Sequence, residues 1–144
     1  MQVQDFMSKN VVSITPEESA ALAARLLERH NLGALPVCDY EGRLQGIVTD
    51  RDIITRCVAA NQDPKRVPVR DIMSRELHTV EPGEDIHAAA RRMAACQVRR
   101  LPVVEGDQVK GMVSLGDLAT SRRCEMEAAQ ALSEISENVV RRKR

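Results

Sequence analysis

The chain has 144 residues, 43% of them hydrophobic and 29% charged, a composition that fits one ordinary globular domain or two very small ones and excludes a large enzyme and a disordered chain. Its 21 basic and 21 acidic residues cancel, and one Tyr, one Phe and no Trp leave few rings for base stacking, so nucleic-acid binding is not expected. Because no apolar run is long enough to span a membrane and residues 1–10 lack the pattern of a secretory signal, we expect a cytoplasmic protein without membrane contact.

A short β-type run at residues 11–14 precedes the first predicted helix. Three residues indicate the start of that helix: Thr15 as the N-cap, Pro16 at the first helical position and Glu18 as the capping-box glutamate. The helix is expected to continue to about residue 30. Its small and apolar residues share one stripe and are Ala20, Ala23, Ala24 and Leu27. One face of the helix should therefore pack on a sheet.

Two more strands and a second helix follow in the sequence. Residues 35–38 are typical of a buried strand, residues 39–42 of a hairpin turn and residues 44–48 of the return strand. A helix is predicted from Thr49, and four of its apolar side chains are expected to face inward: Ile53, Ile54, Cys57 and Val58. Two prolines then interrupt a polar stretch, which we assign to a linker at residues 61–70.

The second half of the chain repeats the first. An offset of 66 residues aligns the Asp-x-Met-Ser segments at 5–8 and 71–74 and the Leu-Pro-Val tripeptides at 35–37 and 101–103. Each copy predicts a β-α-β-β-α unit with a small three-stranded sheet, which is too small to bury a sufficient core alone. We therefore predict an α+β fold in which two repeats, residues 5–60 and 71–123, pack with pseudo-twofold symmetry.

Residues 124–144 predict a C-terminal helix followed by a basic tail. The helix carries a narrow apolar seam, which consists of Ala128, Leu132, Ile135 and Val139. The seam is expected to pack either on the same chain or on a second copy in a dimer, and both alternatives stay open. Arg141–Arg144 is typical of a solvated end rather than a nucleic-acid clamp.

Cysteine and histidine spacing does not indicate a metal site or a catalytic centre. Cys38, Cys57, Cys96 and Cys124 include no Cys-x-x-Cys pair, so we expect reduced core thiols, with a redox role for Cys38 as the alternative. The sequence also has no nucleophile elbow, P-loop or paired-carboxylate motif. We predict no catalytic residue, no bound metal and no enzymatic activity.

One repeated element runs from a strand into a helix and carries the candidate site. Thr49 and Asp52 in the first copy correspond to Ser114 and Asp117 in the second. A hydroxyl at a helix start suits phosphate oxygens, and a nearby carboxylate can accept from both hydroxyls of a ribose. The alternative is that each pair only caps its own helix. Repetition at the same point of both copies favours ligand binding.

This Gly-apolar-apolar-(Thr/Ser)-x-x-Asp element, with the Leu-Pro-Val and Asp-x-Met-Ser segments, resembles the cystathionine β-synthase (CBS) domain family over residues 5–123. The resemblance implies a stand-alone bacterial tandem pair, called a Bateman module. Such a pair binds AMP, ADP, ATP or S-adenosylmethionine between its repeats as a regulatory ligand, and no other cofactor is implied. The family habit of pairing modules also implies a homodimer.

The resemblance further implies roles for individual residues. Asp52 and Asp117 would hold ribose hydroxyls, and Thr49 and Ser114 would contact the ribose or the α-phosphate. The stretch Val98, Arg99 and Arg100 matches a phosphate-binding stretch in the nucleotide-sensing subunit of AMP-activated kinase.

The two clefts are not expected to be equal. The resemblance places Arg100 opposite Asp52, where Arg51 is also available, whereas the Asp117 cleft would face the uncharged Gly33 and Ala34. We therefore expect the Asp52 cleft to bind a phosphorylated ligand more tightly, and the Asp117 cleft to be empty or to prefer a ligand with less negative charge. The competing hypothesis is an interaction protein whose clefts are vestigial and which acts through its dimer surface.

Overall fold

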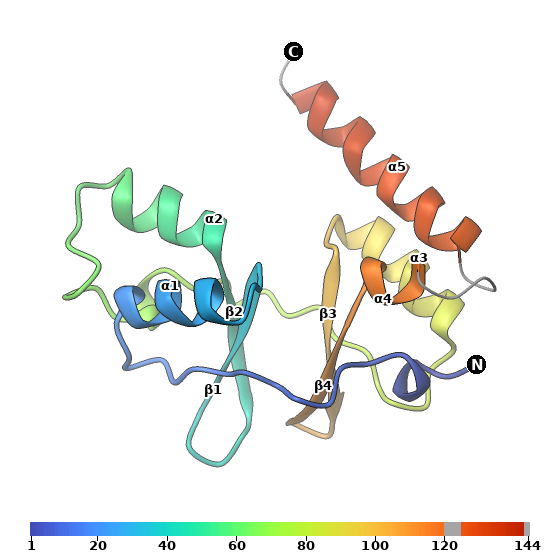
Figure 1. Ribbon diagram of the computed structural model, residues 1–144, viewed down its shortest axis with the longest axis horizontal. Coiled ribbons are helices and arrows are strands. Elements are labelled where there is room, and N and C mark those ends of the chain that lie inside the picture. The colour runs from blue at the N-terminus through green and yellow to red at the C-terminus, as the bar shows by residue number, and fades with distance from the viewer. Residues whose placement is uncertain (120–124, 143–144) are drawn as a thin grey trace. The chain divides into compact units, whose positions relative to one another are not determined.

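The computed structural model describes residues 1–119 and 125–142, and it describes side chains in the last helix only for residues 128–137. The chain forms two compact units. The first-repeat unit comprises Val12–Leu77 and Asp107–Val109, and the second-repeat unit comprises Met1–Val11, His78–Gly106 and Lys110–Arg144. Figure 1 labels the elements of each unit.

The first-repeat unit contains a helix, a β-hairpin and a second helix. These are α1 (Ala20–Arg29), β1 (Ala34–Cys38), β2 (Leu44–Thr49) and α2 (Asp50–Ile53), followed by a π-helical segment η2 (Ile54–Val58) and a 3-10 turn η3 (Val69–Asp71). Strands β1 and β2 are antiparallel, with Leu35 opposite Val48 and Val37 opposite Gly46. The β-hairpin predicted for residues 35–48 is confirmed.

The second-repeat unit has the same order of helix, two strands and helix, and it has one additional helix at its C-terminal end. Its elements are a 3-10 turn η1 (Val3–Asp5), α3 (Ile86–Cys96), β3 (Arg100–Glu105), β4 (Gln108–Ser114), α4 (Leu115–Ala119) and α5 (Glu125–Arg142). Strands β3 and β4 form the second two-stranded sheet. The predicted α+β class with a C-terminal helix is confirmed, and within the described residues no helix is long and apolar enough to cross a membrane.

The predicted first strand of each repeat is reduced to one parallel bridge. Ile14 donates its N–H to the carbonyl of Pro36 at 3.1 Å, and Cys38 donates to Ile14 at 2.9 Å. A longer parallel ladder needs the N–H of residue 16 or residue 36, and both are prolines, which have none. The second repeat has prolines at 82 and 102 around its own bridge between Val80 and Val103. The expectation of three-stranded sheets is therefore wrong.

The predicted N-cap of the first helix is also wrong. The N-cap of α1 is Ser19, whose hydroxyl accepts the N–H of Leu22 at 3.1 Å, whereas Thr15 lies in the preceding turn. A distant segment fixes this start, because Ala20 donates its N–H to the carbonyl of Val67 at 2.8 Å. Residues 1–4 make the corresponding contacts before α3, where Ile86 donates to Met1 at 3.1 Å.

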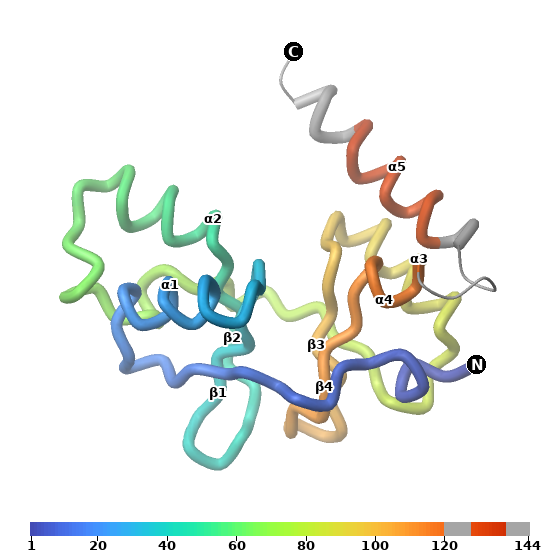
Figure 2. Tube along the Cα trace, viewed as in Figure 1, coloured from blue at the N-terminus to red at the C-terminus, as the bar shows by residue number. Residues whose placement is uncertain are grey.

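The Asp-x-Met-Ser segments are exchanged between the repeats. Ser8 forms two backbone hydrogen bonds with Met112 of β4, at 2.8 and 3.1 Å, and Ser74 forms two with Ile47 of β2, at 2.8 and 3.0 Å. The opening of the first repeat thus pairs with the second repeat, and the reverse holds for the opening of the second. The path of these segments can be followed in Figure 2.

A glycine makes room for each exchanged segment. A Cβ atom on Gly46 would lie 2.6 Å from the Ser74 carbonyl oxygen and 2.9 Å from the Met73 sulfur. On Gly111, it would lie 2.6 Å from the Ser8 carbonyl oxygen and 2.8 Å from the Met7 sulfur. These distances are far below van der Waals contact. In each unit the Met-Ser residues therefore pack directly against the glycine, and the position has no room for a side chain.

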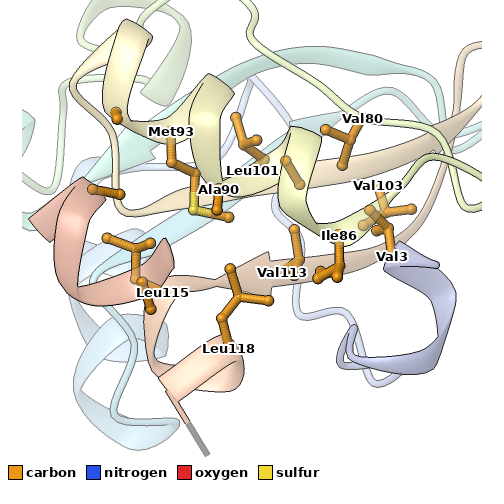
Figure 3. Close-up of a cluster of buried hydrophobic side chains, with 14 of the residues drawn as sticks. Val3, Val80, Ile86, Ala90, Met93, Leu101, Val103, Val113, Leu115 and Leu118 are labelled. Carbon is orange, nitrogen blue, oxygen red and sulfur yellow. The ribbon is translucent and has the colours of Figure 1, made fainter. Parts of the chain in front are cut away.

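Aliphatic side chains form the core of the second-repeat unit, as shown in Figure 3. Fully buried members come from several elements and include Val3, Ile86, Met93, Leu101, Val103, Val113 and Leu118. Val3 is 0% exposed, so the N-terminal segment is an integral part of this core. In the first-repeat unit, Ile72 of the exchanged segment 71–74 and Val69 just before it are also buried in the core.

The C-terminal helix packs on its own chain. Ala128, Ala131 and Ile135 of α5 are buried in the core cluster that also contains residues of α3 and α4. The predicted seam is thus partly wrong, because Ala131 is buried and Leu132 is 42% exposed. The side chain of Val139, its fourth member, lies outside the described residues, as do the side chains of Arg141–Arg144.

The second helix of the first repeat buries fewer side chains than predicted. Ile53 and Cys57, which are four residues apart, are buried, but Ile54 is 60% exposed and Val58 is 57% exposed. Cys38, Cys57 and Cys96 are free thiols, and burial raises the pKa of the Cys38 thiol, as expected for a core cysteine rather than a reactive one. Cys124 lies outside the described residues.

The two buried glycines should be intolerant of any side chain. We expect Gly46→Ala and Gly111→Ala each to lower the free energy of unfolding by about 1–3 kcal/mol, because the clash is with a backbone oxygen that cannot rotate away. Gly83→Ala is the matched control, since a Cβ there meets nothing within 4 Å. Urea unfolding of the three variants measures the effect. Equal stability of Gly83→Ala and Gly46→Ala would contradict this account of the exchanged segments.

Candidate functional site

The first candidate site is the junction at which β2 ends and α2 begins. The hydroxyl of Thr49 accepts the N–H of Asp52 at 3.1 Å, and the N–H of Thr49 donates to Asp52 Oδ2 at 2.9 Å. This is a reciprocal capping box. The Asp52 side chain is 15% exposed, so the carboxylate is largely sheltered but still reachable from solvent.

The second repeat builds the same junction between β4 and α4. The N–H of Ser114 donates to Asp117 Oδ2 at 3.0 Å, and the Ser114 hydroxyl accepts the N–H of Asp117 at 3.1 Å. The two boxes agree to within 0.1 Å in both bonds. The capping interpretation of these residues is therefore correct, and both carboxylates are held in a defined orientation.

The capping hydrogen bonds use only part of the hydrogen-bonding capacity of these hydroxyl and carboxylate groups. A hydroxyl has one donor and two acceptor positions, and a carboxylate has two oxygens, each with two lone pairs. The capping box engages one acceptor position of the Thr49 hydroxyl and one oxygen of Asp52. A ligand hydroxyl can thus bind a carboxylate that the protein has already oriented.

Arg56 contributes to the first junction and was not predicted as a site residue. Its Nε lies 3.9 Å from Asp52 Oδ1, and one of its terminal nitrogens donates to the carbonyls of Ile72 at 3.1 Å and Met73 at 3.2 Å. Arg56 therefore links the Asp52 carboxylate to the exchanged segment. The sequence signal was present as an Asp-Arg pair at i,i+4. The matching position of the second repeat is Ser121, which lies outside the described residues.

The basic residues lie at the start of β3, beside the second junction. Asp50 donates its N–H to Gly33 at 3.3 Å, and Leu115 donates to Arg99 at 3.0 Å, so Gly33 and Arg99 hold matching places in the two units. Arg99 and Arg100 are exposed, as is Arg51 at the first junction. Val98 is half-buried and packs against the hydrophobic core. The predicted pairing of Arg100 with Asp52 joins residues of different units and stays a prediction.

A hollow of about 440 Å³ opens within the second-repeat unit at the Ser114 junction. Arg99, Arg100, Ser114 and Gly116 line one side of it, and residues of α5 line another. Its volume lies in the range of small-molecule sites. The structure thus brings three predicted site residues, Arg99, Arg100 and Ser114, to one concave surface. No cluster of three or more His, Cys, Asp or Glu side chains suited to a metal ion occurs among the described residues.

Comparisons with known proteins agree with this architecture. A family model described as "CBS domain" matches residues 3–59 and 69–123. The CBS domain-containing protein YhcV of Bacillus subtilis is 40% identical over 134 residues, which cover 93% of this chain and 94% of YhcV.

Solved structures give the same result. The CBS domain pair of protein MJ0100, in complex with 5′-methylthioadenosine and S-adenosylmethionine, has a TM-score of 0.75 and 30% identity, covering 83% of this chain and 94% of that one. The structure of Hypoxic Response Protein I with two coordinated zinc ions has a TM-score of 0.78 and 31% identity. The match covers 83% of this chain and 98% of that one. With two matched repeats that span most of its length, the chain belongs to the CBS domain family.

Proposed function

We propose that this CBS pair is a regulatory module that binds an adenosine-containing ligand, such as AMP, ADP, ATP or S-adenosylmethionine, and performs no catalysis on it. The observation that carries the proposal is the pair of matching capping boxes, Thr49–Asp52 and Ser114–Asp117, at the ends of β2 and β4. The complex of the related pair from protein MJ0100 supports an adenosine ligand.

The ribose is the part of the ligand that we assign to the carboxylates. Its two adjacent hydroxyls are donors, and Asp52 and Asp117 are acceptors. Each carboxylate already accepts a backbone N–H from its own cap residue, which restricts its rotamers before a ligand arrives. Preorganisation of this kind favours affinity, because less side-chain entropy is lost on binding. Thr49 and Ser114 would contact the ribose or the α-phosphate.

The phosphates are assigned to the arginines. Charge-assisted hydrogen bonds contribute roughly 1.5–3 kcal/mol each, so a difference of one such contact between two sites corresponds to about tenfold or more in affinity. The family resemblance pairs Arg100 with Asp52, where Arg51 adds a second cation. We therefore propose that the Asp52 site binds the phosphorylated ligand more tightly than the Asp117 site.

We also propose that the protein is a homodimer that forms through the helical face of the first repeat. Ile54 and Val58 are exposed on this face beside a hollow of about 380 Å³ that Leu27 and Leu32 help to line. In the second repeat, the corresponding face of α3 and α4 is covered by α5. The described residues supply no comparable helix for the first repeat, so a second copy is the occupant we propose. Under the competing hypothesis of an interaction protein with vestigial clefts, the protein would act through this same surface.

Calorimetric titration with AMP tests the ligand assignment. We expect two binding phases, and we expect Asp52→Asn or Arg100→Ala to remove the tight phase while Asp117→Asn spares it. Asparagine retains an oxygen that can accept the capping N–H, so this change removes charge without removing the cap. Asp107→Ala, a change of an exposed turn carboxylate, is the control. A single phase with two AMP bound per chain would contradict the proposed inequality, and no binding of AMP, ADP, ATP or S-adenosylmethionine would contradict the ligand assignment.

Light scattering tests the dimer. The unmodified protein should have twice the mass of one chain, and Ile54→Asp combined with Val58→Asp should give monomers, because each places a charge in an apolar contact. Leu132→Asp on α5 is the comparison, and it should leave the dimer intact since α5 packs on its own chain. A monomeric mass for the unmodified protein, or dissociation by Leu132→Asp alone, would show that this assignment is wrong.

A further inference from the structure

We infer that α5 forms one wall of the ligand site at the Ser114 junction, so that occupancy of this site and docking of α5 are coupled. The inference rests on the proposed function and adds to it residues of the C-terminal helix. The hollow of about 440 Å³ is lined by Arg99 and Ser114 and by Ala128, Ala129 and Leu132 of α5. Asp117 is not part of the lining, but two hydrogen bonds hold it to Ser114. Those three α5 residues are not part of the repeated CBS motif.

The chemistry of the hollow fits a ligand with a polar edge and an apolar body. Arg99 brings a positive charge to the lining, which also contains the Ser114 residue; Arg100 lines the hollow as well, but the proposed function assigns it to the Asp52 site. The α5 part of the lining consists of small and apolar side chains, and Leu132 is 42% exposed there instead of being buried. An anionic or neutral nucleoside can place its polar atoms toward Arg99 and Ser114 and its base along the α5 residues.

The described part of α5 packs on α3 and α4 through small side chains and one isoleucine. Among the α5 side chains that the structure describes, residues 128–137, the buried ones are Ala128, Ala131 and Ile135. A second hollow of about 450 Å³, lined by Ala90, Ala94 and Ala131, lies between α3 and α5. Described residues of α5 thus line two hollows, with Ala128 and Leu132 in the first and Ala131 in the second. A ligand that adds contacts to Ala129 and Leu132 must stabilise the docked position of α5, and docked α5 must raise the affinity for that ligand by the same factor.

The test fills the hollow from the α5 side. Ala129→Trp places an indole ring in the hollow, and Ser133→Trp is the size-matched control, because Ser133 is exposed on α5 and does not line the hollow. In AMP calorimetry, we expect Ala129→Trp to weaken the phase that depends on Asp117 at least tenfold and to leave the phase that depends on Asp52 unchanged. Ser133→Trp should leave both phases unchanged. Equal melting temperatures of the two variants without ligand would show that α5 remains docked.

Hydrogen exchange of the backbone amides of residues 128–137 provides a second readout. AMP should slow exchange of these amides in the unmodified protein and in Ser133→Trp, but not in Ala129→Trp. If both AMP phases survive Ala129→Trp, or if AMP leaves exchange in α5 unchanged, the inference is wrong while the proposed function stands. If the unmodified protein binds none of AMP, ADP, ATP and S-adenosylmethionine, the proposed function itself fails.

Discussion

The close approach of two backbones at Gly46 and Gly111 is the constraint on which the rest of this structure depends. At each place the opening segment of the other repeat passes so near the strand that a Cβ atom would lie 2.6 Å from its carbonyl oxygen. The hydrogen bonds of Ser74 to Ile47 and of Ser8 to Met112 follow directly after these glycines. The strand ends that carry Thr49 and Ser114 are therefore held by a segment of the opposite repeat, and neither unit has a complete core without it.

The exchanged segments also fix the position of the candidate site residues. Each strand, once fixed, delivers a hydroxyl residue to a helix start, and the capping box then orients an aspartate. In the first repeat Arg56 adds a direct link, because it contacts both Asp52 and the carbonyls of Ile72 and Met73. Capping and ligand binding are thus not competing interpretations of these residues, since the cap is what prepares the carboxylate for a ligand. The second junction differs in having α5 and the arginines of β3 beside it.

Local patterns in the sequence were sufficient for the repeat, the hairpins and the junction residues. The offset between the copies, the apolar run that starts at Leu35 and the Thr49–Asp52 spacing are all visible in the sequence, and the structure has the corresponding elements. What could not be predicted depends on contacts between distant segments. The start of α1 moved to Ser19 because Val67 supplies an acceptor, and Ala131 rather than Leu132 is buried because of how α5 lies on α3 and α4. Pro16 and Pro36 could be read from the sequence. That they limit the parallel pairing to one bridge could not be predicted, because this depends on which strands pair and in which register. The role of Arg56 likewise depends on the exchanged segment.

The shift in melting temperature on addition of AMP, compared with free adenine, tests the central claim that the two junction aspartates hold a ribose. A ligand at one hundred times its Kd stabilises the folded state by about 2.7 kcal/mol. We expect a clear rise with AMP, little change with adenine, and no rise with AMP in the double variant Asp52→Asn and Asp117→Asn. An equal rise with adenine, or an undiminished rise in the double variant, would contradict the claim.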